Sequence, residues 1–496
     1  MTDWIARAAV LQPQVRNWFA GHWQQGKPEG QLEKYGPRDG RLLYVLGTTN
    51  EKDIDLAVRD ARRAFADGRW AKRPLQHRKE VLLKLAALVL AHRDELALLE
   101  SLDVGKPISD ALSFDVPTAA AIIRACAEGA DHVYGKVYGV DSTCLSYQLY
   151  RPVGVTAGII GWNFPLMLAA GKIGPSLAMG NSLILKPSEL TSLSAARLAE
   201  LALEAGVPEG VLNVIHGDFR AGTALAHHAD VDLLTFTGST HTGKRLLVAA
   251  GQSNMKRLIL ECGGKAPNLV FEDAPDLNAI ADSVLGSAFW NQGQVCTASS
   301  RLLVQESIKQ QLVDLLIEKT ANLTIGDPLQ ESTRFGALVS RAHRRKVIEY
   351  VDGGVKEGAR IVYQSEQAAP FADGFYAPPT ILDRVSPQQK IAKEEVFGPV
   401  LSVISFQDES HAIEIANGTI YGLSAVLWTR DLARVHRLTQ AVQAGWIVAN
   451  TSSQPRGGPG EGVLSIGGHK QSGLGVEGGL EGLAAYTTQT AVQVYC

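Results

Sequence analysis

Five short apolar runs alternate with helical patterns between Val153 and Glu261, and this alternation limits the possible folds more than any other feature of the chain. Each run has the length of one buried strand, and each segment between two runs carries apolar residues at helical spacing. Strands that alternate with helices form βαβ units, so the sequence predicts a parallel sheet with helices on its faces. The expected strands are VGVTAGII, SLILK, VLNVI, DLLTF and RLILE, and the expected helices are residues 166–179, 192–205, 221–228 and 240–250.

The rest of the chain adds helices before this region and a second α/β region, residues 266–446, after it. Asn50 is a suitable N-cap for helical residues 50–104, in which a second helix is expected from residue 75 to about residue 103. Residues 117–134 continue the helical pattern, and LSYQLY alternates like a strand with one exposed face. Further strands are expected at NLVF, RLLV, VLSVISF and residues 490–495, so the predicted class is α/β.

The length of 496 residues exceeds what one hydrophobic core supports, so two or three domains are expected. A formal net charge of -3 gives no field to hold nucleic acid or an anionic membrane, and neither partner is predicted. The cysteines lack C-x-x-C and metal-ligand spacing, so we expect neither a metal site nor a disulfide framework. The N-terminus lacks a basic region followed by an apolar run, which favours a cytoplasmic protein. The cysteines are Cys126, Cys144, Cys262, Cys296 and Cys496.

Cys296 lies within NQGQVCTASSR, where small and neutral-polar residues flank it on both sides. Bulky apolar neighbours are usual around an inert core cysteine, whereas Gly293 and these short side chains leave a thiol accessible. A free thiol has a pKa of about 8.5, so modest help makes it a strong nucleophile. The alternative is a buried structural cysteine, which this segment alone does not exclude.

Three polar side chains stand at or just after expected strand ends, where open α/β sheets bind their ligands. Asn163 in GWNFP could donate to an oxyanion, Glu261 in ECGGK could be a general base, and Glu189 in KPSE could accept hydrogen bonds from a ribose. A carboxylate at position 189 would also repel a 2′-phosphate. Each residue has a simpler alternative role in a polar turn. Cys262 is expected to point away from Glu261 and to be structural.

Two glycine patterns have nucleotide-binding alternatives. GSTHTGKR, residues 238–245, nearly matches a P-loop, but Arg245 stands where Mg²⁺ coordination needs a hydroxyl. Its helix N-terminus could still hold a diphosphate through free N–H groups. GLGVEG, residues 473–478, matches G-x-G-x-x-G, yet no strand is expected before it and no helix after it. We therefore interpret GLGVEG as a chance match.

Eight stretches, taken together and in order, resemble the motifs of the NAD(P)-dependent aldehyde dehydrogenase superfamily over nearly the whole chain. The resemblance is closest to aminoaldehyde dehydrogenases acting on γ-glutamylaminobutyraldehyde and similar aldehydes, through ALLESLDVGKPI and SNMKR. The eight motifs are WNFP, KPSE, FTGST, ECGGK, GQVC, EEVFGPV, YGLSA and GGHKQSG.

This resemblance implies a fold of three parts. A Rossmann-like NAD-binding domain would take residues 1–127 and 149–258, and a catalytic domain residues 259–470. A small β oligomerisation region would take residues 128–148 and 471–496. NAD is the implied cofactor, a small-molecule aldehyde the implied substrate, and a homodimer or homotetramer the implied assembly.

The resemblance also implies residue roles. Cys296 would form a thiohemiacetal and then a thioester with the aldehyde, Asn163 would hold the oxyanion, and Glu261 would activate the hydrolytic water. Lys172 and Glu477 match family positions linked to proton movement. Cofactor contacts are implied for Trp162, Lys186, Ser188, Glu189, Gly222, Gly238, Ser239, Gly243, Glu395 and Phe397.

The predicted substrate pocket is wide. Gly171 stands where relatives often carry Trp, and Met167 shares its helical face. Trp290 and Ile466, the latter in place of a common Phe, would supply other walls. The pocket would then admit long or bulky aldehydes. The alternative is that the extended loop of residues 451–465 folds back and fills the gap.

Other functions stay open at this stage. A CoA-acylating semialdehyde dehydrogenase would hand the acyl group to CoA, although that branch typically lacks a base at the position of Glu261. A non-catalytic structural relative would not need Cys296, Glu261 and Asn163 together. A P-loop nucleotide hydrolase is the most distant alternative.

Overall fold

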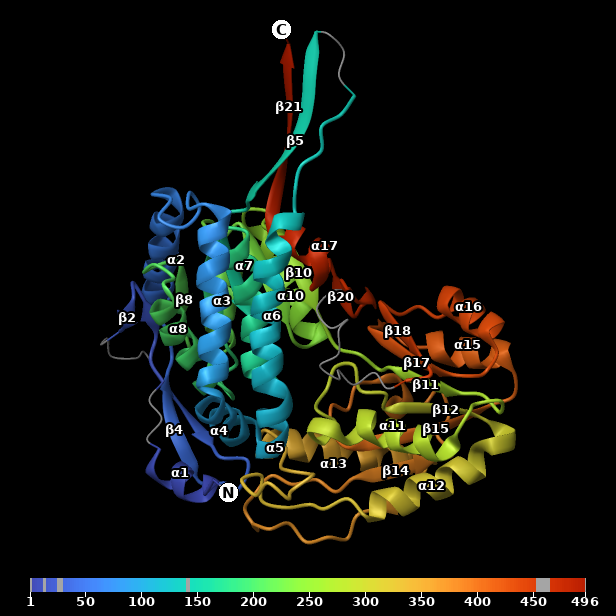
Figure 1. The fold of residues 1–496 in the computed structure, drawn as a ribbon. Helices are drawn as coiled ribbons and strands as arrows, with labels where there is room; N and C mark the ends of the chain where they lie inside the picture. The colour runs from blue at the N-terminus through green and yellow to red at the C-terminus, as the bar shows by residue number, and fades with distance from the viewer. Residues whose placement is uncertain (1, 12–14, 25–29, 140–142, 452–463, 496) are drawn as a thin grey trace.

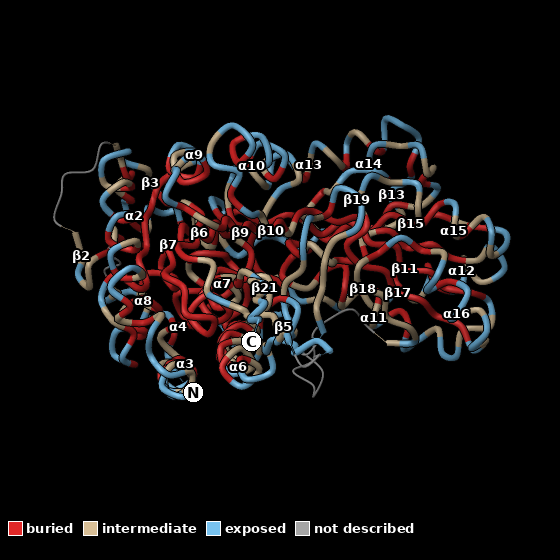
Figure 2. Tube along the Cα trace, turned by 90° about the horizontal axis from the view of Figure 1, so that it is seen from above, coloured by how far each residue is buried: buried red, intermediate tan, exposed pale blue. Residues whose placement is uncertain are grey.

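Two mainly parallel β-sheets, each covered by helices on both faces, make up most of the computed structural model (Figure 1). The structure describes residues 2–11, 15–24, 30–139, 143–451 and 464–495. Figure 2 shows the strands as a buried band between helices whose outer surfaces are exposed. The expected α/β class is confirmed.

The first sheet has the strand order β2-β1-β8-β7-β6-β9-β10-β20. Strands β6 to β10 are parallel, as the alternating runs predict, and β1 and β20 are antiparallel to their neighbours. The order reverses between β6 and β9, a position where open sheets bind ligands at their carboxyl edge. The strands are β1 (Trp18–Phe19), β2 (His22–Trp23), β6 (Val155–Ile159), β7 (Ser182–Lys186), β8 (Leu212–Val214), β9 (Leu233–Thr237), β10 (Arg257–Glu261) and β20 (Gly473–Leu474).

Both faces of this sheet are buried because successive side chains of each strand are apolar and point to opposite sides. Leu183 and Leu185 of β7 pack into a core with α3, α4, α6, α7 and α8, whereas Ile184 packs into a second core with α2, α9 and α10. The helices are α1 (Trp4–Val10), α2 (Glu51–Ala66), α3 (Leu75–Ala91), α4 (Arg93–Val104), α5 (Ile108–Asp110), π-helix η1 (Ala111–Asp115), α6 (Val116–Gly129), 3₁₀-helix η2 (Ala130–His132), α7 (Pro165–Ala178), α8 (Leu193–Ala205), α9 (Phe219–His227), α10 (Thr240–Gln252) and α17 (Gly479–Ala484).

The second sheet has the order β13-β14-β15-β12-β11-β17-β18, and only β13 is antiparallel to its neighbour. Helices α13 to α16 cover one face, and α11 and α12 cover the other. Its strands are β11 (Pro267–Val270), β12 (Arg301–Gln305), β13 (Arg360–Gln364), β14 (Thr380–Asp383), β15 (Val400–Phe406), β17 (Ser424–Trp428) and β18 (Trp446–Ala449). Its helices are α11 (Leu277–Phe289), η3 (Trp290–Gly293), η4 (Glu306–Ile308), α12 (Lys309–Ala321), α13 (Arg341–Lys356), α14 (Lys390–Lys393), α15 (Glu409–Asn417) and α16 (Leu432–Ala441).

Three two-stranded sheets complete the fold. The pair β5 (Cys144–Pro152) and β21 (Thr487–Tyr495) forms an antiparallel ribbon that projects from the body of the molecule in Figure 1. The other pairs are β3 (Gln31–Tyr35) with β4 (Leu42–Gly47), and β16 (Tyr421–Gly422) with β19 (His469–Lys470).

The structure corrects two expectations. The helix expected from residue 75 to about residue 103 is interrupted at His92, whose φ of -96° and ψ of 23° end α3 and precede α4. GLGVEG does begin in a strand, β20, and is followed directly by α17. However, β20 is antiparallel to β10 at the sheet edge, so the segment is not part of a βαβ unit and remains a chance match.

Asn50 caps α2 as predicted, since its side chain accepts a hydrogen bond from the Asp53 amide. No helix in the described ranges is long and apolar enough to cross a membrane. Cys126, Cys144, Cys262 and Cys296 are free thiols, and Cys496 lies outside the described residues.

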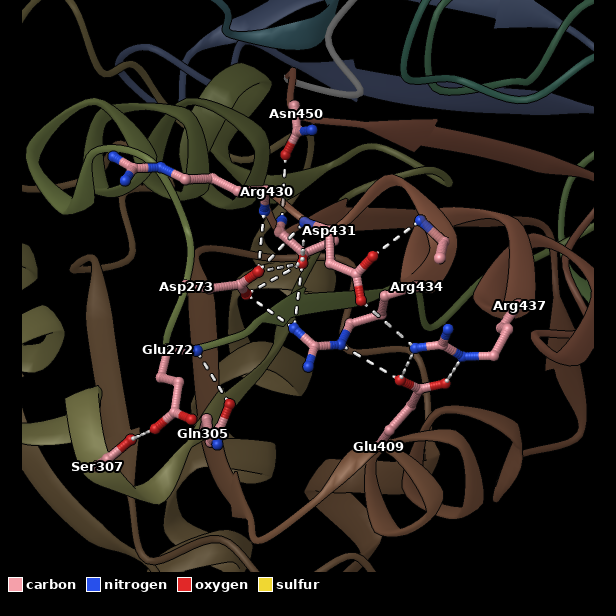
Figure 3. A network of polar contacts seen from close by, with 12 residues as sticks. Glu272, Asp273, Gln305, Ser307, Glu409, Arg430, Asp431, Arg434, Arg437 and Asn450 are labelled. Carbon is pink, nitrogen blue, oxygen red and sulfur yellow. Dashed lines mark hydrogen bonds and ion pairs between the residues drawn. The ribbon is translucent and has the colours of Figure 1, made fainter.

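Asp273 joins the carboxyl ends of neighbouring strands in the second sheet (Figure 3). Its carboxylate, which follows β11, accepts hydrogen bonds from the Thr429 hydroxyl at 2.8 Å and the Arg434 guanidinium at 2.8 Å. It also accepts from the Arg430 and Asp431 amides at the start of α16. Asn450, after β18, accepts from the Thr429 amide at 3.1 Å.

We expect Asp273→Asn to lower the free energy of unfolding by about 1–3 kcal/mol, because several donors lose a charged acceptor. Urea unfolding followed by fluorescence measures the loss. Glu272→Gln is the matched control, since Glu272 accepts from the Ser307 hydroxyl at an exposed site; it should cost less than about 0.5 kcal/mol. Equal losses for the two variants would contradict this role of Asp273.

Candidate active site

The chain crosses from the first sheet to the second through residues 262–266, and this crossing brings the predicted site residues together. Glu261 is the last residue of β10, and β11 begins at Pro267. A Cβ atom on Gly264 would lie 2.3 Å from the Cys296 carbonyl oxygen, and one on Gly263 would lie 2.4 Å from the Glu395 carboxylate. Gly264 is therefore required for a close backbone approach, whereas a side chain at Gly263 would have to displace the end of the Glu395 side chain.

Strained backbone positions the loop that carries Cys296. Asn291, Gln292 and Gly293 have φ values of 47°, 57° and 71°, a run of left-handed residues directly before the cysteine segment. A Cβ atom on Gly293 would lie 2.2 Å from the Gly398 carbonyl oxygen, so this glycine permits a close backbone approach. Non-glycine residues in this region cost free energy and are common at functional sites.

Two hydrogen bonds join Asn163 to the loop that carries Cys296. The Asn163 amide donates to the Gln294 carbonyl oxygen at 3.0 Å, and the Asn291 amide donates to the Asn163 carbonyl oxygen at 3.1 Å. Asn163 is buried, in the turn between β6 and α7. One of its two amide hydrogens is used in this contact, so the group retains a second donor.

The Cys296 thiol is partly accessible, but its electrostatic surroundings differ from the expectation. Burial, followed by the Glu395 and Glu261 carboxylates, raises the pKa of Cys296 to about 12. The charged groups that act on Cys296 are therefore acids, and neither of them favours the thiolate.

Glu261 is a half-buried acid, and one of its two carboxyl oxygens lacks a hydrogen-bond donor. Its Oε1 atom is buried and accepts no hydrogen bond from any residue that the structure describes. Burial, with Glu477 as the next cause, raises the pKa of Glu261 well above its ordinary value, and Lys172 opposes the shift. Lys172 is fully buried in an ion pair with Glu477, and the Thr235 hydroxyl donates to the same Glu477 oxygen at 3.0 Å.

Glu395 and Phe397 face this group from the second sheet, just before β15. The Glu395 carboxylate accepts from the Gly264 amide at 2.9 Å, and burial raises its pKa to about 7. The Phe397 ring contacts the Trp162 ring edge to face, with centroids 5.1 Å apart. His343 of α13 contacts Trp162 at 5.0 Å and its Nε2 lies 2.7 Å from the Phe397 carbonyl oxygen.

The residues expected to hold a ribose meet at the carboxyl end of β7. Lys186 is buried with its ammonium 3.9 Å from the exposed carboxylate of Glu189. A Cβ atom on Gly222 would lie 3.8 Å from the Lys186 side chain, so Gly222 borders it. The Ser188 hydroxyl is used in the turn, accepting from the Leu190 amide at 3.2 Å.

The N-terminus of α10 lies at the carboxyl end of β9, as predicted. Ser239 is the N-cap, and its hydroxyl accepts from the Thr242 amide. Gly238 donates its amide to the Glu261 carbonyl oxygen at 3.0 Å. A Cβ atom on Gly243 would lie 2.7 Å from the Cys262 sulfur, so Gly243 packs against that buried thiol, and its cofactor contact stays a prediction.

An aromatic group lines the side of the Cys296 loop opposite the carboxylates. Trp290 lies 4.7 Å from Phe114 and 5.2 Å from Phe164 between ring centroids, and Met167 packs in the same cluster. A Cβ atom on Gly171 would meet nothing within 4 Å, so space is open there. Ile466 instead exchanges two backbone hydrogen bonds with Glu477.

Sequence patterns did not single out Phe114, His343, Asn291 or Gln294 as site residues. Phe114 lies in the π-helix η1, a feature that often occurs at functional sites but has no sequence signature here. His343 is one polar residue on an amphipathic helix. Asn291 and Gln294 lie within the cysteine segment. The only feature of the sequence that could have pointed to them is their polar character close to Gly293.

Comparison with known proteins gives one family. The aldehyde dehydrogenase family model matches residues 23–492. The NADP/NAD-dependent aldehyde dehydrogenase PuuC of Escherichia coli (strain K12) is 43% identical over 98% of this chain and 96% of its own.

Two solved structures are similar throughout. A mutant of the P. syringae indole-3-acetaldehyde dehydrogenase AldA, solved with NAD⁺ and IAA, has a TM-score of 0.96 and 42% identity, over 100% of this chain and 99% of its own. The γ-glutamyl-γ-aminobutyraldehyde dehydrogenase of Burkholderia cenocepacia J2315 has the same TM-score of 0.96 and 42% identity, over 99% of each chain.

We expect Glu395→Gln to speed alkylation of Cys296 by iodoacetamide about 3–10-fold at pH 8, because loss of a negative charge favours the thiolate. Since the pKa of Glu395 is about 7, the acceleration should be present above pH 7 and fade below it. Mass spectrometry of the Cys296 peptide measures the rate. Glu394→Gln, at an exposed neighbouring carboxylate, is the control; an equal effect of both variants would argue against specific coupling.

Proposed function

The chain belongs to the aldehyde dehydrogenase family, and from this membership we propose that Cys296, Glu261 and Asn163 carry out its NAD-dependent oxidation of an aldehyde to a carboxylic acid. The observation that supports this proposal best is the buried Oε1 atom of Glu261, which accepts no hydrogen bond from the described residues and belongs to a carboxyl group whose charge acts on the Cys296 thiol. A base and a nucleophile in one partly enclosed site suit acyl chemistry.

The residues present suit NAD. Glu189 is exposed beside the buried Lys186 ammonium, which is the arrangement of acceptor and donor that a ribose diol needs. The N-terminus of α10 at Gly238 and Ser239 suits a diphosphate. Trp162, Glu395 and Phe397 would hold the nicotinamide riboside. The chemistry that NAD supplies when bound is acceptance of a hydride from the aldehyde carbon.

In the proposed mechanism, the Cys296 thiol releases its proton to solvent, and the thiolate sulfur attacks the carbonyl carbon of the aldehyde. The oxygen that becomes negative would accept hydrogen bonds from the second amide hydrogen of Asn163 and from the Cys296 backbone N–H. One such donor is typically worth about 3–4 kcal/mol of barrier. The mutual hydrogen bonds between Asn163 and the Cys296 loop keep the donor in place while charge develops.

Glu261 would then take a proton from the water that hydrolyses the thioester. Its raised pKa makes it a stronger base than an exposed carboxylate once it is ionised. Glu477 and Lys172, paired beside it, would carry the proton away. The CoA-acylating alternative is disfavoured by Glu261, and a non-catalytic role by the retention of all three groups.

For the substrate, we propose a bulky or amino-aldehyde. The open space at Gly171 and the aromatic group of Phe114, Phe164 and Trp290 suit a long or aromatic chain. The names of the similar proteins, γ-glutamyl-γ-aminobutyraldehyde and indole-3-acetaldehyde dehydrogenase, are consistent with this class. The alternative was that the extended loop of residues 451–465 folds back and fills the gap. Most of that loop, residues 452–463, lies outside the described residues.

The predicted three-part division and assembly also remain proposals. The projecting ribbon of β5 and β21 exposes Leu145, Val494 and Tyr495, which supports a role in a homodimer or homotetramer. We propose a cytoplasmic location on the basis of the sequence.

We expect Glu261→Gln to produce a burst of NADH followed by a steady state about 100-fold or more below wild type, because thioester forms but hydrolyses slowly. Rapid mixing with NAD⁺ and an aldehyde measures both phases. Cys296→Ala, in which no thioester can form, should show neither phase. An unchanged steady state for Glu261→Gln would remove this residue from the mechanism, and rescue of turnover by CoA would favour the acylating alternative.

We expect Gly171→Trp to lower kcat/KM for bulky aldehydes about tenfold or more while leaving propanal unchanged, because the indole would occupy the open space. Initial rates with a series of aldehydes of increasing length measure the effect. Gly353→Trp is the matched control, at a helical glycine of α13 that also has nothing within 4 Å. Equal loss for short and bulky aldehydes would mean that Gly171 does not set the pocket width.

A further inference from the structure

Two cationic side chains are buried side by side at the start of the second sheet. Lys265 and Arg301 are each 2% exposed, and they stand just before β11 and at the start of β12. The Arg301 guanidinium donates to the Lys265 carbonyl oxygen at 2.9 Å and to two carbonyl oxygens of α15. Backbone carbonyls thus hold Arg301, but they do not neutralise its charge.

The Lys265 ammonium has no such partner. Its nitrogen is buried and makes no hydrogen bond with any of the described residues. Glu395 and Glu394 favour its charge from a distance, but neither carboxylate forms an ion pair with Lys265 in the part of the chain that the structure describes. An isolated buried ammonium is costly unless it is neutralised or paired.

A small cavity adjoins both cations. It is lined by Lys265, Arg301, Ser424 and Gln443 among others, and its volume of about 10 Å³ is close to the least that one water molecule needs. Two buried cationic side chains, one of them with an unsatisfied donor, therefore adjoin a space of single-water size.

We propose that this cavity binds a monovalent monatomic anion of the chloride class, held by the Lys265 ammonium and the charge of Arg301. Burial and the Arg301 charge lower the pKa of Lys265 to about 7, and a bound anion would reverse this effect by stabilising the ammonium. The competing state is a neutral Lys265 amine beside one water molecule.

The site lies directly behind the nucleophile loop. Ser424, which lines the cavity, donates through its hydroxyl to the Thr297 carbonyl oxygen at 3.4 Å, one residue beyond Cys296. A bound anion would therefore stabilise the packing of Lys265 and Ser424 against the loop that carries Cys296. It touches neither the thiol nor the residues that would hold NAD.

The first test compares thermal unfolding in sodium gluconate and in sodium chloride at equal ionic strength, which keeps general screening constant. Chloride at ten times its dissociation constant should raise the Tm of the wild-type protein by about 1–2 °C. Lys265→Met should lose this response, whereas Lys356→Met, which removes an exposed lysine of α13, should retain it. A wild-type Tm that is independent of chloride would overturn the proposal.

The second test does not depend on whether Lys265→Met folds. Crystals of the wild-type protein grown without chloride and soaked in sodium bromide should show anomalous density in contact with the Lys265 ammonium. Density for a water molecule without an anomalous signal would assign the neutral-amine state and contradict the anion site. Either result is independent of aldehyde oxidation, which the NADH burst tests separately.

Discussion

The close approach at Gly263 and Gly264 is the contact on which the site depends. The carboxyl edge of one sheet and the amino edge of the other meet through only five residues, 262–266. A Cβ atom on Gly264 would displace the Cys296 carbonyl, and one on Gly263 would displace the end of the Glu395 side chain. Because both sheets are buried on both faces, their edges cannot shift independently to make room. The position of the Cys296 loop is thus fixed by backbone contact.

The contact between the two sheet edges also determines which charged groups surround Cys296. Glu261 comes from the first sheet, Glu395 from the second, and Glu477 from the segment between β20 and α17. Lys172 is the ammonium paired within this group. Burial is the main reason why the pKa values of Cys296 and Glu261 are both raised, and the excess of carboxyl groups adds to it. It also favours a ligand with positive charge near the thiol, which agrees with a cofactor whose oxidised nicotinamide ring is cationic.

The sequence predicted the features that depend on local pattern. Apolar runs predicted the five parallel strands of the first sheet and β11, β12 and β15 of the second, but not β13, β14, β17 and β18. Motif order predicted that Asn163, Glu261 and Cys296 belong to one site. What it could not predict depends on tertiary partners. His343 and Phe114 gain their positions from rings that are distant in sequence. The raised pKa of Cys296 arises from burial in the folded protein and then from Glu395, about a hundred residues away. The interruption at His92 has neither Pro nor Gly to predict it.

Backbone strain gives the site a further property. Among the described residues, eight non-glycine residues have positive φ, and Asn291, Gln292 and Phe397 are three of them. Asn291 and Phe397 are each tied by hydrogen bonds that use their own side chain or carbonyl. Strain persists only where surrounding contacts determine the conformation more strongly than local preference does. The loop of Cys296 is therefore held in a single conformation against its own tendency to relax, which is the condition under which a fixed oxyanion donor lowers a barrier without reorganising first.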